Sequence, residues 1–412
     1  MRSNDARALA KQYDSADPLR GFRDRFVIED PDLIYLDGNS LGRLPKQSAK
    51  LLTDVVQEQW GKGLVRSWSD HWIDKPRLIG EKIGALIGAE PGEVLVCDST
   101  SVNFYKLALA ALHCRRDRPH IVTDTSNFPS DLYVLQGCAK QTGHTVKILN
   151  GEEVEEALDN RTALLALTHT EFKSGFIQPM SRLTARAHEI GALTLWDLSH
   201  SVGVMPIDLR AAHVDLAVGC TYKYLNGGPG APAFLYARKE LQKELQNPIW
   251  GWFGQKNPFE FALDYSPADG LQRFASGTPS VLSLMPVEIG VDLVLEAGIN
   301  PIREKSVKQT QFLVQLWEAF LAEHDVTLNS PRNAEQRGSH VSLGHPEAYR
   351  VDQALINDMK VVPDFREPDN IRLGVSPLYT TYGELAEATL RLKTILAERT
   401  YERYSSRRGG VT

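Results

Sequence analysis

The sequence predicts an α/β protein, with a large domain built on a mostly parallel sheet and a smaller α+β domain after it. Short runs of Val, Leu, Ala and Ile alternate with helix-like segments through the middle of the chain, as in sheets that are buried on both faces. After about residue 285 the pattern changes to long amphipathic helices with isolated strands between them. The length of 412 residues also favours more than one domain, since domains average roughly 150 residues.

The expected strands of the large domain are continuous apolar runs. The first is followed by the Ser- and Thr-rich DSTSVN and then by the apolar helix FYKLALAALH. An amphipathic helix, SRLTARAHEIG, precedes a later strand. The strands are expected at 92–97, 120–124, 162–170, 192–198, 214–220 and 232–238. Alternation of strand and helix is the signature of one α/β unit, which we assign to residues 51–285.

The remaining residues, 286–412, are expected to form the smaller domain. Long helices at 302–323 and 383–399 flank the short strands HVSLGH and NIRLGVS. Residues 1–50 begin with a polar, helix-like stretch and are expected to complete this domain.

The composition excludes several classes of protein. A net charge of −6 without long single-sign runs argues against nucleic acid and anionic membranes as partners. No apolar stretch approaches the roughly 20 residues needed to span a bilayer. The cysteines lack CxxC spacing and zinc-finger His partners, so we expect reduced thiols in a cytoplasmic protein without a metal site. They are Cys97, Cys114, Cys138 and Cys220.

Polar residues fall at the carboxyl ends of three expected strands, where ligands of parallel sheets bind. Lys223 follows one strand in a glycine-rich turn, and burial there would lower the pKa of its amine and favour a Schiff base. Pyridoxal 5′-phosphate uses such a lysine together with an acidic residue at its ring nitrogen, a role suited to Asp197. Thr100 and Ser101, at a helix start, offer hydroxyls and backbone N–H groups to a phosphate.

Each of these residues also has a purely structural interpretation. Lys223 between two tyrosines could be a surface lysine, DSTSVN a helix cap, and Asp197 the cap of the next turn. His200 could be a hydrogen-bonded core histidine. The combination, in this order and at three strand ends, favours a cofactor site.

Several segments in the same order resemble the kynureninase family, which belongs to the fold type I (aspartate aminotransferase-like) pyridoxal phosphate enzymes. The resemblance runs from YLDGNSLGRLP to IRLGVSPLYTTYGE and includes SNFPSDLY, LWDLSHSVG, CTYKYLNGGPG and GWFG. It implies a mostly parallel seven-stranded sheet sandwiched by helices. It also implies an obligate homodimer with shared active sites.

By this resemblance Lys223 carries the cofactor and Asp197 pairs with its ring nitrogen, while His200 lies in the same ring environment. Phe128 would stack on the ring, and Asp131 would bond near its phenolic edge. Contacts to the cofactor phosphate are implied for Thr100, Ser101 and Tyr222, and for Trp252 and Thr278 from the partner subunit. Thr168 is a weaker match to the cofactor site.

The implied reaction is the hydrolysis of L-kynurenine to anthranilate and L-alanine in tryptophan catabolism, the kynurenine pathway that also feeds NAD biosynthesis. 3-Hydroxykynurenine, which would give 3-hydroxyanthranilate, stays open as a second substrate. Arg372 resembles the arginine that holds the substrate α-carboxylate, and Tyr222 is our candidate donor of a proton to the β-carbon. Trp68 and Gly277 stand where family members that prefer 3-hydroxykynurenine commonly have His and Asn. A site that reads a hydroxyl needs a polar partner, so we expect preference for unsubstituted kynurenine.

Other functions remain open from the sequence. A cysteine desulfurase or selenocysteine lyase needs a nucleophilic cysteine in its C-terminal lobe, and no cysteine follows Cys220. An aminotransferase is excluded less firmly. A non-catalytic binding protein would be expected to lack Lys223 or Asp197, and a metal-dependent hydrolase would need a tighter ligand pattern than HTEF and DLSHS.

Overall fold

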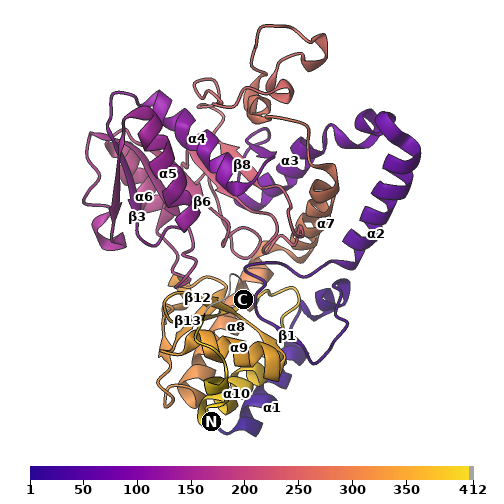
Figure 1. Cartoon of the computed structure of the whole chain (residues 1–412), viewed down its shortest axis with the longest axis vertical. Helices are drawn as coiled ribbons and strands as arrows, with labels where there is room; N and C mark the ends of the chain where they lie inside the picture. Colours follow the sequence, from indigo (N-terminus) through magenta and orange to yellow (C-terminus); the bar gives the residue numbers. More distant parts are fainter. Residues whose placement is uncertain (408–412) are drawn as a thin grey trace.

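A computed structural model describes residues 1–407. Figure 1 shows two lobes, with the large sheet in the upper lobe and both ends of the described chain contributing to the lower one. The predicted α/β fold with a mostly parallel sheet of seven strands is confirmed.

The large sheet has the strand order β2-β8-β7-β6-β5-β3-β4. Only β8 runs against its neighbours, so the carboxyl ends of the other strands share one edge. The strands are β2 (Val94–Val96), β3 (His120–Asp124), β4 (Thr145–Leu149), β5 (Thr162–Thr168), β6 (Leu193–Asp197), β7 (Leu216–Gly219) and β8 (Phe234–Ala237). The sequence analysis missed β4, an edge strand whose residues are partly exposed and which therefore lacks a continuous apolar run.

Helices cover both faces of this sheet because successive strand residues point to opposite sides. Leu164 packs in the core under α4 (Thr100–Cys114) and α5 (Pro129–Thr142). Its neighbour Leu165 packs in the core under α3, α6 and α7. Those helices span Lys75–Ile87, Met180–Glu189 and Val281–Ala297.

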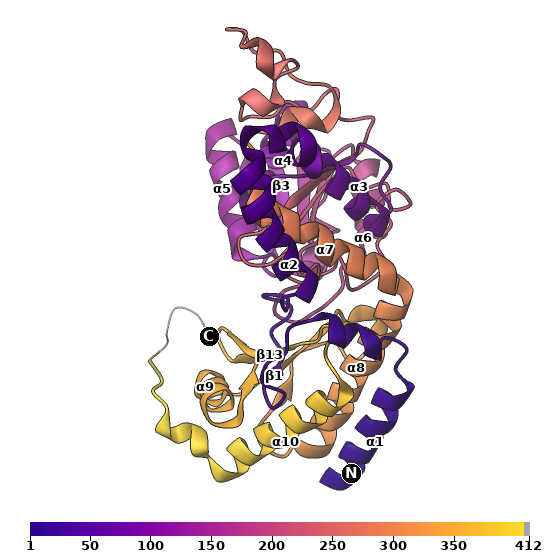
Figure 2. The ribbon, with the colours of Figure 1, turned by 90° about the vertical axis from the view of Figure 1, so that its right-hand side faces the viewer.

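The small domain is an antiparallel sheet, β12-β13-β10-β9, with helices packed on it. Its strands are β9 (Thr327–Leu328), β10 (His340–Gly344), β12 (Asp364–Arg366) and β13 (Asn370–Gly374). Its helices are α8 (Ile299–Phe320), α9 (Ala348–Met359) and α10 (Tyr382–Glu398). In Figure 2 the helix pair α7 and α8 runs from the upper lobe into the lower one.

The N-terminal residues pack with this small domain. Helix α1 (Ser3–Ala16) lies against α10, and β1 (Ile34–Tyr35) forms a parallel pair with β11 (Val361–Val362). The chain then crosses to the large domain through α2 (Lys46–Asp54).

Two segments carry exposed apolar side chains away from both cores. One is the helical stretch 55–72 after α2, which we call the arm, and the other is the loop 250–263 at the top of Figure 1. Their exposed apolar residues include Trp60, Leu64, Val65, Trp250, Trp252, Phe259, Phe261 and Leu263. Within residues 1–407, none of the helices has the length and apolar character needed to cross a membrane.

Candidate active site

Lys223 lies in the turn after β7, next to His200 from the turn after β6. Its Nζ is 2.8 Å from Nε2 of His200 and 5.9 Å from the ring centroid of Phe128. The turn is held from both sides. The Gly42 amide donates to the Tyr222 carbonyl, and the backbone of α7 touches the Leu225 carbonyl, where a Cβ on Gly290 would lie only 1.7 Å away.

His200 is buried and neutral. Burial, then the positive charges of Lys223 and Arg372, hold the pKa of this imidazole well below its usual value. Its Nε2 therefore accepts from the Lys223 amine. Its Nδ1 is buried without a hydrogen-bond partner among residues 1–407.

Two carboxylates from different elements meet beside Lys223. Asp197 ends β6 and accepts from the Ser199 amide at 2.7 Å, and Asp131 lies in the first turn of α5. Burial, then the close Asp197 carboxylate, raise the pKa of Asp131 well above its usual value. Oδ2 of Asp131 has no partner in the described part of the chain. This acidic pair, in a buried site, is complementary to a positively charged ring nitrogen.

The first turns of α4 and α5 lie side by side and are joined by two serine hydroxyls. Thr100 and Ser101 begin α4 after the capping Ser99, and Ser101 Oγ lies 2.6 Å from Ser130 Oγ at the start of α5. Helix N-termini present backbone N–H groups without intrahelical partners and the positive ends of their dipoles. Two such ends with adjacent hydroxyls suit a phosphate.

Two further expected residues border this site. Thr168 is buried at the end of β5, opposite Asp197 in the sheet, and its hydroxyl donates to the Thr170 carbonyl at 3.3 Å. Tyr222 is half-buried, and the Cys220 thiol, then burial, raise its pKa above the usual value. Its phenol therefore stays protonated near neutral pH.

Arg372 reaches the same region from β13 of the small domain and is almost completely engaged by the protein. Four of the five N–H groups of its guanidinium have acceptors. The Asp364 carboxylate accepts two hydrogen bonds from Arg372, one from Nε at 2.9 Å and one from Nη2. Nη2 also donates to Ser40 Oγ at 2.8 Å, and Nη1 donates to the Phe172 carbonyl at 2.6 Å. Arg366 also pairs with Asp364 at 2.7 Å.

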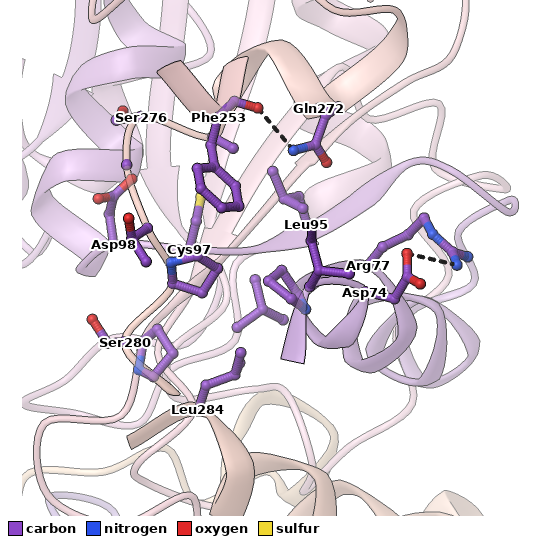
Figure 3. A pocket seen from close by; sticks show the side chains of 18 residues that line it. Asp74, Arg77, Leu95, Cys97, Asp98, Phe253, Gln272, Ser276, Ser280 and Leu284 are labelled. Atoms are coloured by element: carbon purple, nitrogen blue, oxygen red, sulfur yellow. Dashed lines mark hydrogen bonds and ion pairs between the residues drawn. The ribbon is translucent and has the colours of Figure 1, made fainter. Parts of the chain in front are cut away.

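The other expected residues lie elsewhere on this chain. Gly277 and Thr278 line a cavity of about 110 Å³ together with Leu95–Asp98 and Phe253, shown in Figure 3. Trp68 packs in the arm against Trp72, with a ring-centroid distance of 5.3 Å. Trp252 is exposed in the 250–263 loop. Within residues 1–407, none of these four expected residues forms a hydrogen bond, ion pair or ring contact with Lys223.

Sequence reasoning missed four residues that shape the site: Ser130, Ser40, Asp364 and His340. The first two sit inside the segments SNFPSD and GNSLG, so hydroxyls in those segments were the available signal. Asp364 is brought to Arg372 by pairing of β12 with β13, which no local pattern indicates. Among residues 1–407, no cluster of three His, Cys, Asp or Glu could hold a metal ion.

Comparison with known proteins identifies the family. The chain is 43% identical to the kynureninase of Pseudomonas fluorescens over 406 residues, which is 97% of this chain and 96% of that protein. The chain belongs to the kynureninase family. A kynureninase of Burkholderia pseudomallei (strain 1106a) is 40% identical over 95% of both chains. The model of the kynureninase C-terminal domain matches residues 302–392, which contain α9, β10 and β13.

Solved structures show that this kynureninase-family chain shares its fold with cysteine desulfurases. The enzyme of Thermococcus onnurineus NA1 has a TM-score of 0.77 at 19% identity, covering 94% of this chain and 98% of its own. CsdA of Escherichia coli has a TM-score of 0.77 at 16% identity, with 92% and 98% coverage. A mutant of the cystine C-S lyase C-DES, with glycine covalently linked to its pyridoxal phosphate, also shares the fold. Its TM-score is 0.77 at 16% identity, covering 88% of this chain and 97% of its own.

Proposed function

We propose that this protein is a pyridoxal 5′-phosphate-dependent kynureninase, which uses water to split L-kynurenine into anthranilate and L-alanine. One observation carries the proposal: proteins named kynureninase match the chain over almost its entire length, at 40% to 43% identity. The site described above has the groups that this reaction requires.

The residues present fit the cofactor. Asp131 and Asp197 form a buried acidic pair with an unpartnered oxygen, which a protonated ring nitrogen and its ring substituents would satisfy. Ser101 and Ser130, with Thr100, offer a phosphate the ends of two helices. When bound, pyridoxal phosphate supplies an electron sink for the bonds broken at the substrate α-carbon.

The holding roles follow from these positions. Lys223 would hold the cofactor covalently through Nζ, Asp197 would hold the proton of the ring nitrogen, and Asp131 would bond at the ring edge. Phe128 would cover the ring face, since its own ring lies 5.9 Å from the Lys223 amine. Thr168 and His200 would complete the ring environment, and Tyr222 would reach the phosphate.

Proton movements are assigned to two side chains. Lys223 Nζ would take the α-proton of the substrate, and the neutral His200 orients this amine by accepting a hydrogen bond from it at 2.8 Å. Tyr222 stays protonated at neutral pH and is suited to give its phenolic proton to the β-carbon after the aryl acid has left. Arg372 would hold the α-carboxylate.

The active form is proposed to be a homodimer with shared sites. The arm and the 250–263 loop expose apolar side chains that a monomer would leave in water. Within residues 1–407, Trp252 and Thr278 form no hydrogen bond or ring contact with Lys223 of their own chain. In a dimer these two residues would reach the phosphate of the partner's site. The aryl pocket would include Trp68 and Gly277, whose lack of a strong polar group supports preference for unsubstituted kynurenine.

We place the enzyme in the cytoplasm, in tryptophan catabolism by the kynurenine pathway. Four cysteines without a disulfide among residues 1–407 support a reducing compartment. The desulfurase alternative is disfavoured because the last of these cysteines is Cys220, which is buried at the end of β7.

The deciding experiment mixes the purified protein with pyridoxal phosphate and L-kynurenine and follows anthranilate fluorescence, with L-alanine measured in equal amount. L-Cysteine with an added thiol reductant is the parallel substrate, with sulfide as the readout, because the reductant releases transferred sulfur as sulfide. Anthranilate without sulfide is expected. Sulfide release, or no anthranilate from protein that has taken up the cofactor, overturns the proposal.

A further inference from the structure

A buried histidine of the small domain, His340, faces the catalytic lysine region from the side of Arg372. In the antiparallel pair of β10 and β13, His340 lies opposite Gly374 and Ser342 lies opposite Arg372. Directly opposite residues point to the same face of a sheet. The His340 ring therefore shares a face with the Arg372 guanidinium, and its centroid is 5.7 Å from that of His200.

This face holds several polar atoms without partners. His340 is fully buried, and within residues 1–407 neither ring nitrogen forms a well-aligned hydrogen bond. The Asn39 amide lies directly over Gly374, where a Cβ would meet its oxygen at 1.8 Å, and both amide atoms also lack partners. Buried polar groups are rarely left unsatisfied, so this concentration indicates a polar ligand.

Arg372 alone cannot bind a carboxylate with a free fork. One of its N–H groups remains unused, because Asp364, Ser40 and the Phe172 carbonyl accept from the other four. A carboxylate placed here needs another donor to replace the hydrogen bonds that it made to water.

We propose that His340 is a substrate-binding residue that donates a ring N–H to the α-carboxylate beside Arg372, and so selects α-amino acids. The inference rests on the proposed function and deepens it. The location agrees with the geometry of such a substrate, whose amine must reach Lys223 while its carboxylate reaches Arg372. His340 contacts His200, the partner of Lys223, and lies on the face that carries Arg372.

The histidine acts as a neutral donor. Burial, then the positive charge of Arg372, lower the pKa of His340 to about 3. Of the weaker influences, Lys223 also lowers this pKa, whereas Asp364 and the Lys173 carbonyl raise it. The histidine therefore keeps one N–H across the working range, and its contribution to binding is expected to be the same from pH 6 to pH 9.

The test compares His340→Leu and His340→Met, which remove the donor, with His340→Gln, which restores one. Two probes of the holoenzyme are titrated by calorimetry or by the cofactor absorbance: L-alanine, and the amine that corresponds to kynurenine without its α-carboxylate. Ser342→Ala is the matched control, because Ser342 shares the strand and face and bonds to the Lys173 carbonyl.

L-Alanine is expected to bind about tenfold more weakly to the Leu and Met variants, with the Gln variant within about threefold of wild type. The carboxylate-free amine is expected to bind all variants alike. The KM for kynurenine should rise in step with the loss of alanine affinity, with kcat changed less.

Unchanged alanine affinity in a folded Leu or Met variant overturns the inference, as does an equal loss for both probes. The Met side chain is flexible and fills irregular space, so it carries the test where Leu does not fold. Failure of the proposed function is distinguishable, because wild-type protein would then bind no cofactor or release no anthranilate.

Discussion

The amine of Lys223 lies 2.8 Å from Nε2 of His200, and this histidine is held neutral by burial and by neighbouring cations. The pair joins the turns after two adjacent parallel strands, β6 and β7. A neutral imidazole adds no second positive charge beside Lys223 and orients its Nζ through one hydrogen bond, which suits a lysine that forms a covalent bond and transfers a proton.

Replacing Lys223 by Ala is expected to abolish both covalent cofactor attachment and turnover. Purified wild-type protein should show visible absorption from the cofactor joined to Lys223. Borohydride should replace it with near-ultraviolet absorption that dialysis no longer removes, and the dialysed variant should show neither. The exposed Lys173, whose amine lies 5.7 Å from the Phe172 ring near the site, provides the control variant Lys173→Ala. Near-ultraviolet cofactor absorption that stays with Lys223→Ala after borohydride treatment and dialysis contradicts the assignment.

Replacing Tyr222 by Phe is expected to slow steady-state turnover by about 10²- to 10⁴-fold, the usual contribution of a positioned acid. The loss should fall after C–C cleavage, so rapid mixing should still give a fast first turnover of anthranilate. The exposed Tyr133 supplies the matched Tyr133→Phe control. A first turnover slowed as much as the steady state would assign Tyr222 to an earlier step.

Two changes in the aryl pocket are expected to alter ring specificity. Trp68→His with Gly277→Asn should raise the ratio of kcat/KM for 3-hydroxykynurenine over kynurenine by about tenfold or more, since the new groups can bond the hydroxyl. Apart from its two chain neighbours, no atom of residues 1–407 lies within 4 Å of the Cβ position of Gly277, so the larger side chain has space within its own chain. Measuring kcat/KM for both substrates with each single variant shows which substitution changes the specificity. If the ratio of the two kcat/KM values is unchanged in the double variant, the aryl pocket lies elsewhere.

Shared active sites predict complementation between inactive variants. Lys223→Ala lacks the lysine of its own site, and Trp252→Ala with Thr278→Ala lacks the groups offered to the partner. Subunits exchanged after mixing should form hybrid dimers with one intact site, restoring about a quarter of wild-type activity at equal mixing. If each active site were built from a single chain, mixing the two inactive variants would restore no activity.

The buried Asp352 on α9 makes stability fall as pH rises. Burial, then the Asp364 charge, raise its pKa to about 7, so between pH 4 and 7 the folded state holds a proton that the unfolded state has lost. Wild-type stability therefore declines over this range by up to about 1.4 kcal/mol per pH unit from this group and levels off above it.

Asp352→Asn removes this contribution, so the variant should gain stability relative to wild type between pH 5 and pH 8. Urea unfolding of the holoenzyme at pH 5, 6.5 and 8 measures the difference. Glu304→Gln, at an exposed position, is the control. A difference that stays constant with pH would contradict a raised pKa at this site.

Much of the large domain could be predicted because its strands are buried on both faces. The apolar run at 120–124 coincides with β3, and the run at 192–198 contains β6. Because β6 and β7 are parallel, Asp197 at the end of β6 and Lys223 in the turn after β7 lie at the same edge of the sheet. The two-domain boundaries at 50 and 285 stay predictions.

The small-domain side of the site could not be predicted in the same way. Asp364, Arg372 and His340 come together only through the antiparallel pairing of three strands, and Ser40 joins them from the opposite end of the chain. No local sequence pattern indicates that the Arg372 guanidinium is occupied by acceptors, or that His340 lacks a well-aligned hydrogen bond within residues 1–407. Both follow from contacts between residues more than 300 positions apart or across strands.

The pairing of β1 with β11 has a consequence for biosynthesis. Ile34 finds its strand partner only in Val361, so the segment that carries Ser40 and touches the Lys223 turn has no sheet to join while the ribosome is still making the middle of the protein. The large sheet can form on the nascent chain before then. Activity is therefore expected to emerge only after release, later than the bulk of the helix and strand content.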